Sequence, residues 1–174
     1  HEGRALGAGD LIQAFSSERF LGDDHVMPGD LIPNYAKELA VDVILGPQDD
    51  VFTTEGVENF LCNAYTVTSE SDRMGYRLEG APIERKSAVE LVTEALMEGV
   101  VQVPGSGKPI VLMVDAQTSG GYPKIATVTM PGVSRLAQAK PNERVRFNRI
   151  SLAQARAKYL EFCGVLARLN VRLS

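Results

Sequence analysis

Residues 115 to 124, DAQTSGGYPK, place many kinds of reactive or binding side chain in one short connection that follows the apolar run IVLMV. Gln117 and Thr118 could hydrogen-bond a polar substrate, and Lys124 could supply a cation that burial would tune. Gly120 and Gly121 permit either a positive φ or a close approach of the backbone, and nearby amides could hold an anion or a developing oxyanion. A polar turn between two strands would need the same residues, so both interpretations stay open.

A second stretch, SDRMGYRLEG (71–80), brings two arginines and a tyrosine around a glycine. Arg73 or Arg77 could recognise a carboxylate, because a planar guanidinium makes bidentate hydrogen bonds. The alternative is a strand with a core face and a solvated cationic face. The core face would then be formed by Met74, Tyr76 and Leu78.

Two other motifs favour structural roles. GSGKP (105–109) lacks the phosphate-loop pattern, because Gln102 stands where a glycine is required and Pro109 follows the lysine. It therefore predicts a hairpin turn. In GDDHV (22–26) adjacent side chains cannot all face one ion, which favours a solvated loop. The two cysteines have no metal-ligand spacing, so we expect no metal site.

The elements that would position these residues are mostly short strands. The hairpin runs over 100–114, GAGDLI (7–12) and MPGDLI (27–32) each predict a turn feeding a strand, and other strands are predicted at 39–50, 64–68, 71–80, 124–130 and 143–150. Helices are predicted from a Thr53 or Thr54 cap, over 87–99 from a Ser87 cap, and over 151–169. The last would have an apolar stripe of Leu152, Ala155, Tyr159, Phe162 and Leu166. This pattern predicts a mostly β, barrel-like or α+β fold.

The bulk composition narrows the function. With 174 residues the chain fits one domain. A net charge of −4 with no long basic block argues against a nucleic-acid partner. We find no apolar stretch of membrane-spanning length and no signal peptide, and the few cysteines fit a reducing cytoplasm.

Three segments carry a family resemblance: GVVQVPGSGKPIVLMVDAQTSGGYPKIATV (99–128), GPQDDVFTTEGVENFLCNAYTVTSESDRMGYRLEG (46–80) and EGRALGAGD (2–10). They resemble the KipA / allophanate hydrolase subunit 2 family, which also includes biotin-dependent carboxyltransferase domains and a subunit of 5-oxoprolinase. The resemblance implies a cyclophilin-like β-barrel over residues 1–174. It also implies that this domain is the C-terminal half of a longer protein with two such halves.

The resemblance implies an enzyme subunit that acts on the C–N bond of an amide or lactam, such as 5-oxoproline or allophanate, together with a KipI-like partner protein and its own N-terminal half. ATP or a biotin carrier would come from the wider complex, since the chain has no recognisable motif for either. Two alternatives stay open: a regulator that antagonises a kinase inhibitor, as KipA does, and the carboxyltransferase component of a urea carboxylase-like enzyme.

Within this hypothesis Lys124, Gln117 and Thr118 are the expected catalytic residues. Lys124 would stabilise developing negative charge or assist proton transfer. Expected substrate-binding residues are Arg73, Tyr76, Arg77, Gln102, Asp115, Gly120, Gly121 and Tyr122.

Overall fold

The computed structural model describes residues 6–13, 29, 32, 36–86 and 91–168. Contacts divide the chain into residues 1–32 and 33–174, and each part is described by itself. In the first part a turn brings the Asp10 N–H to the Gly7 carbonyl at 3.2 Å, but no strand follows within residues 11–13. Most of the second phrase, MPGDLI, and all of GDDHV lie outside the described residues.

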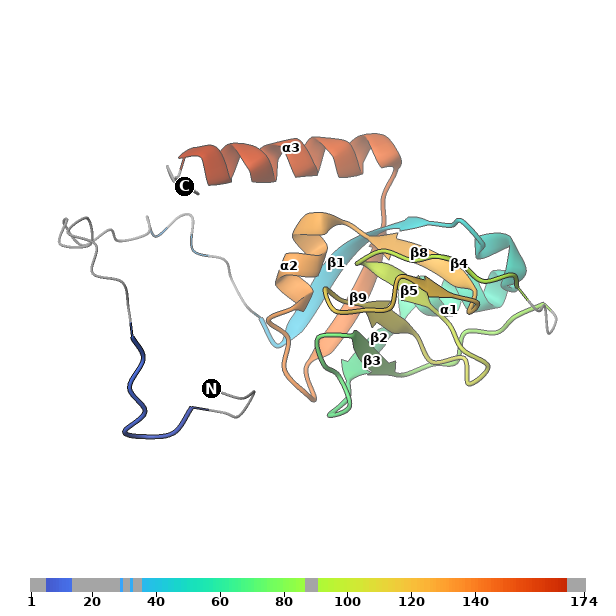
Figure 1. Cartoon of the computed structure of the whole chain (residues 1–174). Coiled ribbons are helices and arrows are strands. Elements are labelled where there is room, and N and C mark those ends of the chain that lie inside the picture. Colours follow the sequence, from blue (N-terminus) through green and yellow to red (C-terminus); the bar gives the residue numbers. More distant parts are fainter. Residues whose placement is uncertain (1–5, 14–28, 30–31, 33–35, 87–90, 169–174) are drawn as a thin grey trace. The chain divides into compact units, whose positions relative to one another are not determined.

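The second part is built around a closed barrel in the strand order β1-β8-β5-β6-β3-β2-β9 (Figure 1). Its strands are β1 (Glu38–Leu45), β2 (Ala64–Val67), β3 (Gly75–Glu79), β5 (Val100–Gln102), β6 (Ile110–Leu112), β8 (Lys124–Val128) and β9 (Arg144–Arg149). β1 pairs with β9 in parallel, and the other neighbours that pair in the barrel are antiparallel. The prediction of a mostly β, barrel-like fold is therefore confirmed.

An aromatic cluster fills the core beneath α1 (Thr54–Cys62), which follows a short 3₁₀ helix, η3 (Asp49–Val51). Thr53 caps α1, as predicted, because its Oγ1 accepts the Gly56 N–H at 2.9 Å. Phe60 of α1 is fully buried and stacks on Phe147 of β9 with ring centroids 4.5 Å apart.

The hairpin predicted over 100–114 is present, with β5 and β6 antiparallel. Its connection folds back through a hydrogen bond from the Gly107 N–H to the Pro104 carbonyl, 3.0 Å long. Gly107 has a φ of 73°, a conformation that favours glycine. GSGKP is therefore a turn, as the sequence predicted.

The helix predicted over 87–99 is wrong for the residues that the structure describes. Residues 91–99 contain no helix, and they include strand β4 (Glu94–Ala95), which pairs with β7 (Ser119–Gly120). Ser87, the predicted cap, lies outside the described residues. Here β4 pairs with β7 and the Leu96 N–H donates to the Thr118 carbonyl at 2.9 Å, so tertiary pairing overrides the local helix pattern.

The strand predicted over 124–130 ends in helix α2 (Met130–Leu136), which the sequence pattern does not predict because Pro131 and Gly132 are typical of a turn. Proline is favoured in the first turn of a helix, where its missing N–H leaves no hydrogen bond unmade. α2 packs on β1, and α3 (Leu152–Arg168) contacts both α2 and β1. In α3 the predicted apolar stripe is only partly covered, with Ala155 buried but Leu152, Tyr159 and Leu166 exposed.

Candidate functional site

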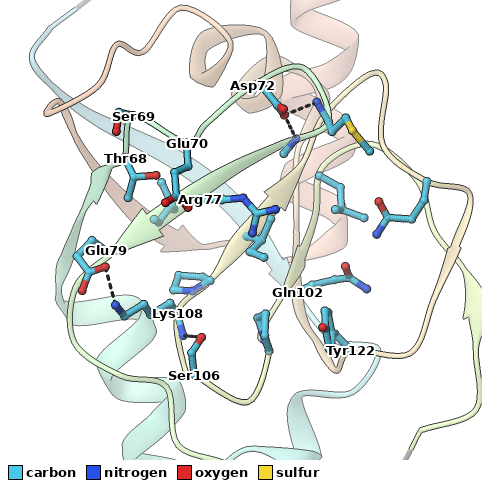
Figure 2. Close-up of a pocket in the computed structure, with 18 residues that line it drawn as sticks. Thr68, Ser69, Glu70, Asp72, Arg77, Glu79, Gln102, Ser106, Lys108 and Tyr122 are labelled. Atoms are coloured by element: carbon cyan, nitrogen blue, oxygen red, sulfur yellow. Dashed lines mark hydrogen bonds and ion pairs between the residues drawn. The ribbon is translucent and has the colours of Figure 1, made fainter.

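Two adjoining cavities open beside the β5–β6 hairpin. The first, of about 570 Å³, lies between this hairpin, β3 and the loop that precedes it (Figure 2). The second, of about 470 Å³, lies beside the 120–123 connection. Gln102, Gln117 and Tyr122 line both cavities. Three of the predicted site residues thus meet at the junction of the two.

Gln102 is the last residue of β5 and is 1% exposed. The pairing of β5 with β8 shifts register between Val101 and Gln102. Such irregularities redirect side chains and are common beside active sites. Gln102 Nε2 has no hydrogen-bond partner within the described structure. A buried amide donor without an acceptor is destabilising, which makes it a group that a ligand oxygen could satisfy.

Close packing explains Gly120, the last residue of β7. A Cβ on Gly120 would lie 2.8 Å from Leu96 Cδ1 and 3.2 Å from Gln102 Nε2. Neither Gly120 nor Gly121 has a φ in the left-handed region. Of the two explanations that the sequence left open, the close approach therefore holds for Gly120.

Lys124 begins β8 and is 4% exposed. Its Nζ contacts the Glu94 carboxylate of β4, which also accepts a 3.1 Å hydrogen bond from Gln48 Nε2. The Gln48 side-chain oxygen in turn accepts the Lys124 N–H at 3.0 Å. Lys124 lines neither cavity, and its buried ammonium pairs with a half-exposed carboxylate in contacts that hold β4 beside β8.

The first cavity carries charges of both signs. It is lined by Glu70, Asp72, Glu79, Arg77 and Lys108. Lys108 and Glu79 form an ion pair at 2.8 Å, and Asp72 accepts backbone N–H groups of its own loop. Figure 2 shows the Arg77 side chain extending into the cavity, where its guanidinium forms no ion pair or hydrogen bond with the other residues drawn.

Other predicted site residues lie away from this junction. Arg73 pairs with Asp115 at 2.7 Å, with the arginine side chain largely exposed and the aspartate side chain about half exposed. The Tyr76 hydroxyl lies 3.2 Å from the carbonyls of both Ala137 and Ala139, which share its one proton, and burial raises the pKa of Tyr76.

Thr118 likewise lines neither cavity. Its carbonyl accepts the Leu96 N–H at 2.9 Å. The backbone of Thr118 therefore joins the segment that follows β4 to the segment that precedes β7.

Sequence reasoning missed Arg85 and Thr68. Arg85 lines the second cavity and is half-buried. Thr68 lines the first, and its Oγ1 is buried with no partner among the described residues. Thr68 ends the strand predicted over 64–68, whereas Arg85 lies in residues 81–86, for which the sequence predicts no element, and no local spacing pattern distinguishes either residue.

Two classes of feature are not found in the described ranges. No group of three or more histidine, cysteine, aspartate or glutamate side chains there could hold a metal ion. None of the helices described has the length and apolar character needed to cross a membrane.

Comparisons with known proteins agree with this architecture. The chain is 37% identical over 155 residues to a subunit of the 5-oxoprolinase of Haemophilus influenzae, covering 88% of this chain and 48% of that protein. It is 37% identical over 154 residues to the corresponding 5-oxoprolinase subunit of Escherichia coli, with the same coverage. The chain thus spans about half the length of these relatives.

A solved structure, the urea amidolyase of K. lactis, matches 79% of this chain and 9% of its own with a TM-score of 0.73 and 22% identity, which supports the fold. Residues 1–149 match the family model described as the carboxyltransferase domain, subdomain A and B. With this match over most of its length and a closed barrel of the expected kind, the chain belongs to the carboxyltransferase domain family.

Proposed function

We propose that this chain is part of a protein that cleaves the C–N bond of an amide or lactam, with 5-oxoproline as the first candidate substrate. One observation carries the proposal: the buried, unpartnered Nε2 of Gln102 at the junction of two cavities. Support also comes from the 37% identity to two proteins named as subunits of 5-oxoprolinase.

Hydrolysis of a lactam C–N bond requires a hydrogen-bond donor at the substrate carbonyl oxygen. When water adds to a lactam carbonyl, negative charge develops on the oxygen before the C–N bond breaks and the nitrogen leaves as an amine. A preorganised donor in a site shielded from water stabilises that charge. Gln102 would serve as this donor, Gln117 would bond the lactam N–H or carbonyl, and Tyr122 would pack on the ring.

Lys124 has a different place in this proposal. Its ammonium is held by Glu94 outside both cavities, so it would position β4 and its partner β7 rather than contact substrate. Gly120, which lies in β7 next to Gln102, would be the residue positioned in this way.

The wider assembly is part of the proposal. The chain would act with a KipI-like partner protein and with the remainder of its own longer protein, and ATP would bind elsewhere in the complex. The test is to purify the full-length protein with its partner subunits and to measure glutamate release from 5-oxoproline with and without ATP. ATP-dependent release is expected.

A second candidate function is carboxyl transfer from a biotinylated carrier, favoured by the match to the carboxyltransferase domain family. It predicts no glutamate release and a strict dependence on the carrier. Tight binding of the KipI-like partner with no turnover in either assay would contradict both enzyme proposals and favour a regulator.

A further inference from the structure

The two cavities differ in the charge of the side chains that line them. The second cavity has one charged side chain among its described lining residues, Arg85. The first is lined by three carboxylates, those of Glu70, Asp72 and Glu79, and by two cations. An anionic ligand group is therefore attracted to the second cavity, while in the first it would face an excess of negative charge.

Arg85 is available for such a group. Its side chain is half-buried, and its guanidinium forms no ion pair or hydrogen bond with any residue in the described ranges. Partial burial strengthens an ion pair with a ligand, because solvent screens it less. Arg77, by contrast, is exposed and lies in the acidic cavity.

The backbone around Arg85 is held in place. Arg85 forms a bridge with Phe52, which is 1% exposed. On either side, the Thr53 N–H donates to the Glu84 carbonyl at 3.1 Å and the Lys86 N–H donates to the Val51 carbonyl at 2.9 Å. The arginine thus projects from a segment fixed to the core, which reduces the entropy lost on binding.

The hairpin turn leaves room for the guanidinium. A Cβ on Gly105 would lie 3.3 Å from Arg85 Nη2. Because Gly105 has no side chain, the guanidinium can lie close to the backbone of the β5–β6 connection.

The second cavity also reaches the unpartnered donor. Gln102 lines it together with Arg85, and the Gln102 Nε2 lacks an acceptor among the described residues. A neutral donor suits a carbonyl oxygen, and a guanidinium suits a carboxylate, with which it makes paired hydrogen bonds.

From these contacts we infer that Arg85 is the residue that selects a carboxylate on the substrate, with the substrate's carbonyl on Gln102. The site then takes small molecules that carry both an amide or lactam carbonyl and a carboxylate. This inference rests on the proposed function in assigning the carbonyl to Gln102, but the role of Arg85 can be measured by binding alone.

The experiment compares three ligands in calorimetric titrations of the full-length protein with its partner subunits. 5-Oxoproline has both groups, 2-pyrrolidinone is the same ring without the carboxylate, and succinamate has an open-chain amide and a carboxylate. Arg85→Gln is expected to weaken 5-oxoproline and succinamate binding by about 10- to 100-fold, as for loss of a charge-assisted pair. Binding of 2-pyrrolidinone should stay unchanged.

Three variants make the result specific. Arg85→Lys keeps the charge but loses the planar fork, so an intermediate loss is expected, and this variant decides the matter if Arg85→Gln does not fold. Arg156→Gln removes an exposed arginine of α3 as the matched control and should change none of the affinities. Arg77→Gln tests the other cavity.

The inference is overturned if the Arg85 variants keep wild-type affinity for both carboxylates, if Arg77→Gln alone removes it, or if wild-type protein binds no carboxylate ligand. It is upheld if carboxylate binding depends on Arg85 but the complex releases no glutamate from 5-oxoproline. That last result would contradict the proposed function alone.

Discussion

Lys124 and Glu94 form an ion pair in which the two partners are buried to different extents. The lysine side chain is 5% exposed and the glutamate side chain is 50% exposed. Lys124 lies in β8 and Glu94 lies in β4, so the ion pair connects these two strands. β4 in turn pairs with β7, where Glu94 lies opposite Gly120. The pair therefore links a buried strand of the barrel to the connection that borders both cavities.

Glu94→Gln should destabilise the protein more than Lys124→Met. Removing the carboxylate charge leaves a buried ammonium without compensation, which costs about 3 kcal/mol. Removing the ammonium leaves a carboxylate that water can reach, and methionine fills the buried space, so a loss of about 1 kcal/mol is expected. Urea unfolding of both single variants measures the difference. An equal loss in the two would contradict the importance of the difference in burial.

The buried hydroxyl of Tyr65 should make the free energy of unfolding fall at alkaline pH. Burial raises its pKa to about 12, and its hydroxyl donates to the Ala81 carbonyl at 3.1 Å. Because the folded-state pKa lies above the ordinary value of about 10, this stabilisation is complete below about pH 10 and is lost as the pH rises through about 12. Unfolding free energies measured across that window should fall less steeply in Tyr65→Phe, and equal slopes would contradict the argument.

The elements with strong local patterns were predictable, and those that depend on tertiary pairing were not. The Thr53 cap and the β5–β6 hairpin have signals within a few residues of sequence, and both are present. β4 exists because of its pairing with β7 and the contact of Glu94 with Lys124. No pattern within 91–99 contains that information.

The residues of the candidate site also divide into those that local sequence indicates and those that tertiary pairing brings in. Gln117 and Tyr122 lie in one short connection, so their meeting at the cavities could be expected from the sequence, whereas Gln102 is brought there at the end of β5. Arg85 lies close to them only because its backbone pairs with Phe52 across the fold. A side chain brought in by such long-range pairing cannot be found from local spacing.

Gly120→Ala should weaken lactam binding more than Gly121→Ala. An added Cβ at Gly120 would lie 3.2 Å from Gln102 Nε2 and push on the proposed donor. At Gly121 the nearest atom would be the Leu91 carbonyl oxygen, also tight at 3.3 Å, with no Gln102 atom within 4 Å. Neither residue needs a positive φ, but a Cβ at Gly120 would also lie 2.8 Å from Leu96 Cδ1, so urea unfolding of both variants is the control for a difference in stability. Titration with 2-pyrrolidinone measures the effect, and equal affinities would argue against Gln102 as the donor.

Tyr76→Phe should reduce stability without changing lactam affinity. The lost hydroxyl bonds the carbonyls of Ala137 and Ala139, which corresponds to about 1 kcal/mol. Tyr122→Ala should show the opposite behaviour, because Tyr122 is 52% exposed and lines both cavities. Thermal unfolding and 2-pyrrolidinone titration on both variants check this pair. A fall in affinity in Tyr76→Phe would restore Tyr76 as a binding residue.

Gln102→Leu should abolish lactam binding and turnover while keeping or raising stability. In the free protein Gln102 Nε2 is buried without a partner among the described residues, which costs about 1–3 kcal/mol. Leucine removes that penalty and fills nearly the same space. A residue kept for packing would show the reverse, because its replacement would lower the unfolding free energy. The combination of unchanged or higher urea midpoint with lost 2-pyrrolidinone binding is therefore specific to a ligand-directed donor.

The control is Gln154→Leu in the first turn of α3, where Gln154 Oε1 accepts the Ser151 N–H at 2.9 Å. That variant loses a satisfied hydrogen bond far along the chain from the cavities, so it should lose a few tenths to 1 kcal/mol and bind normally. If Gln102→Leu also lost stability and bound normally, the buried amide would have a structural partner in solution. The proposed carbonyl site would then have to be assigned to Gln117.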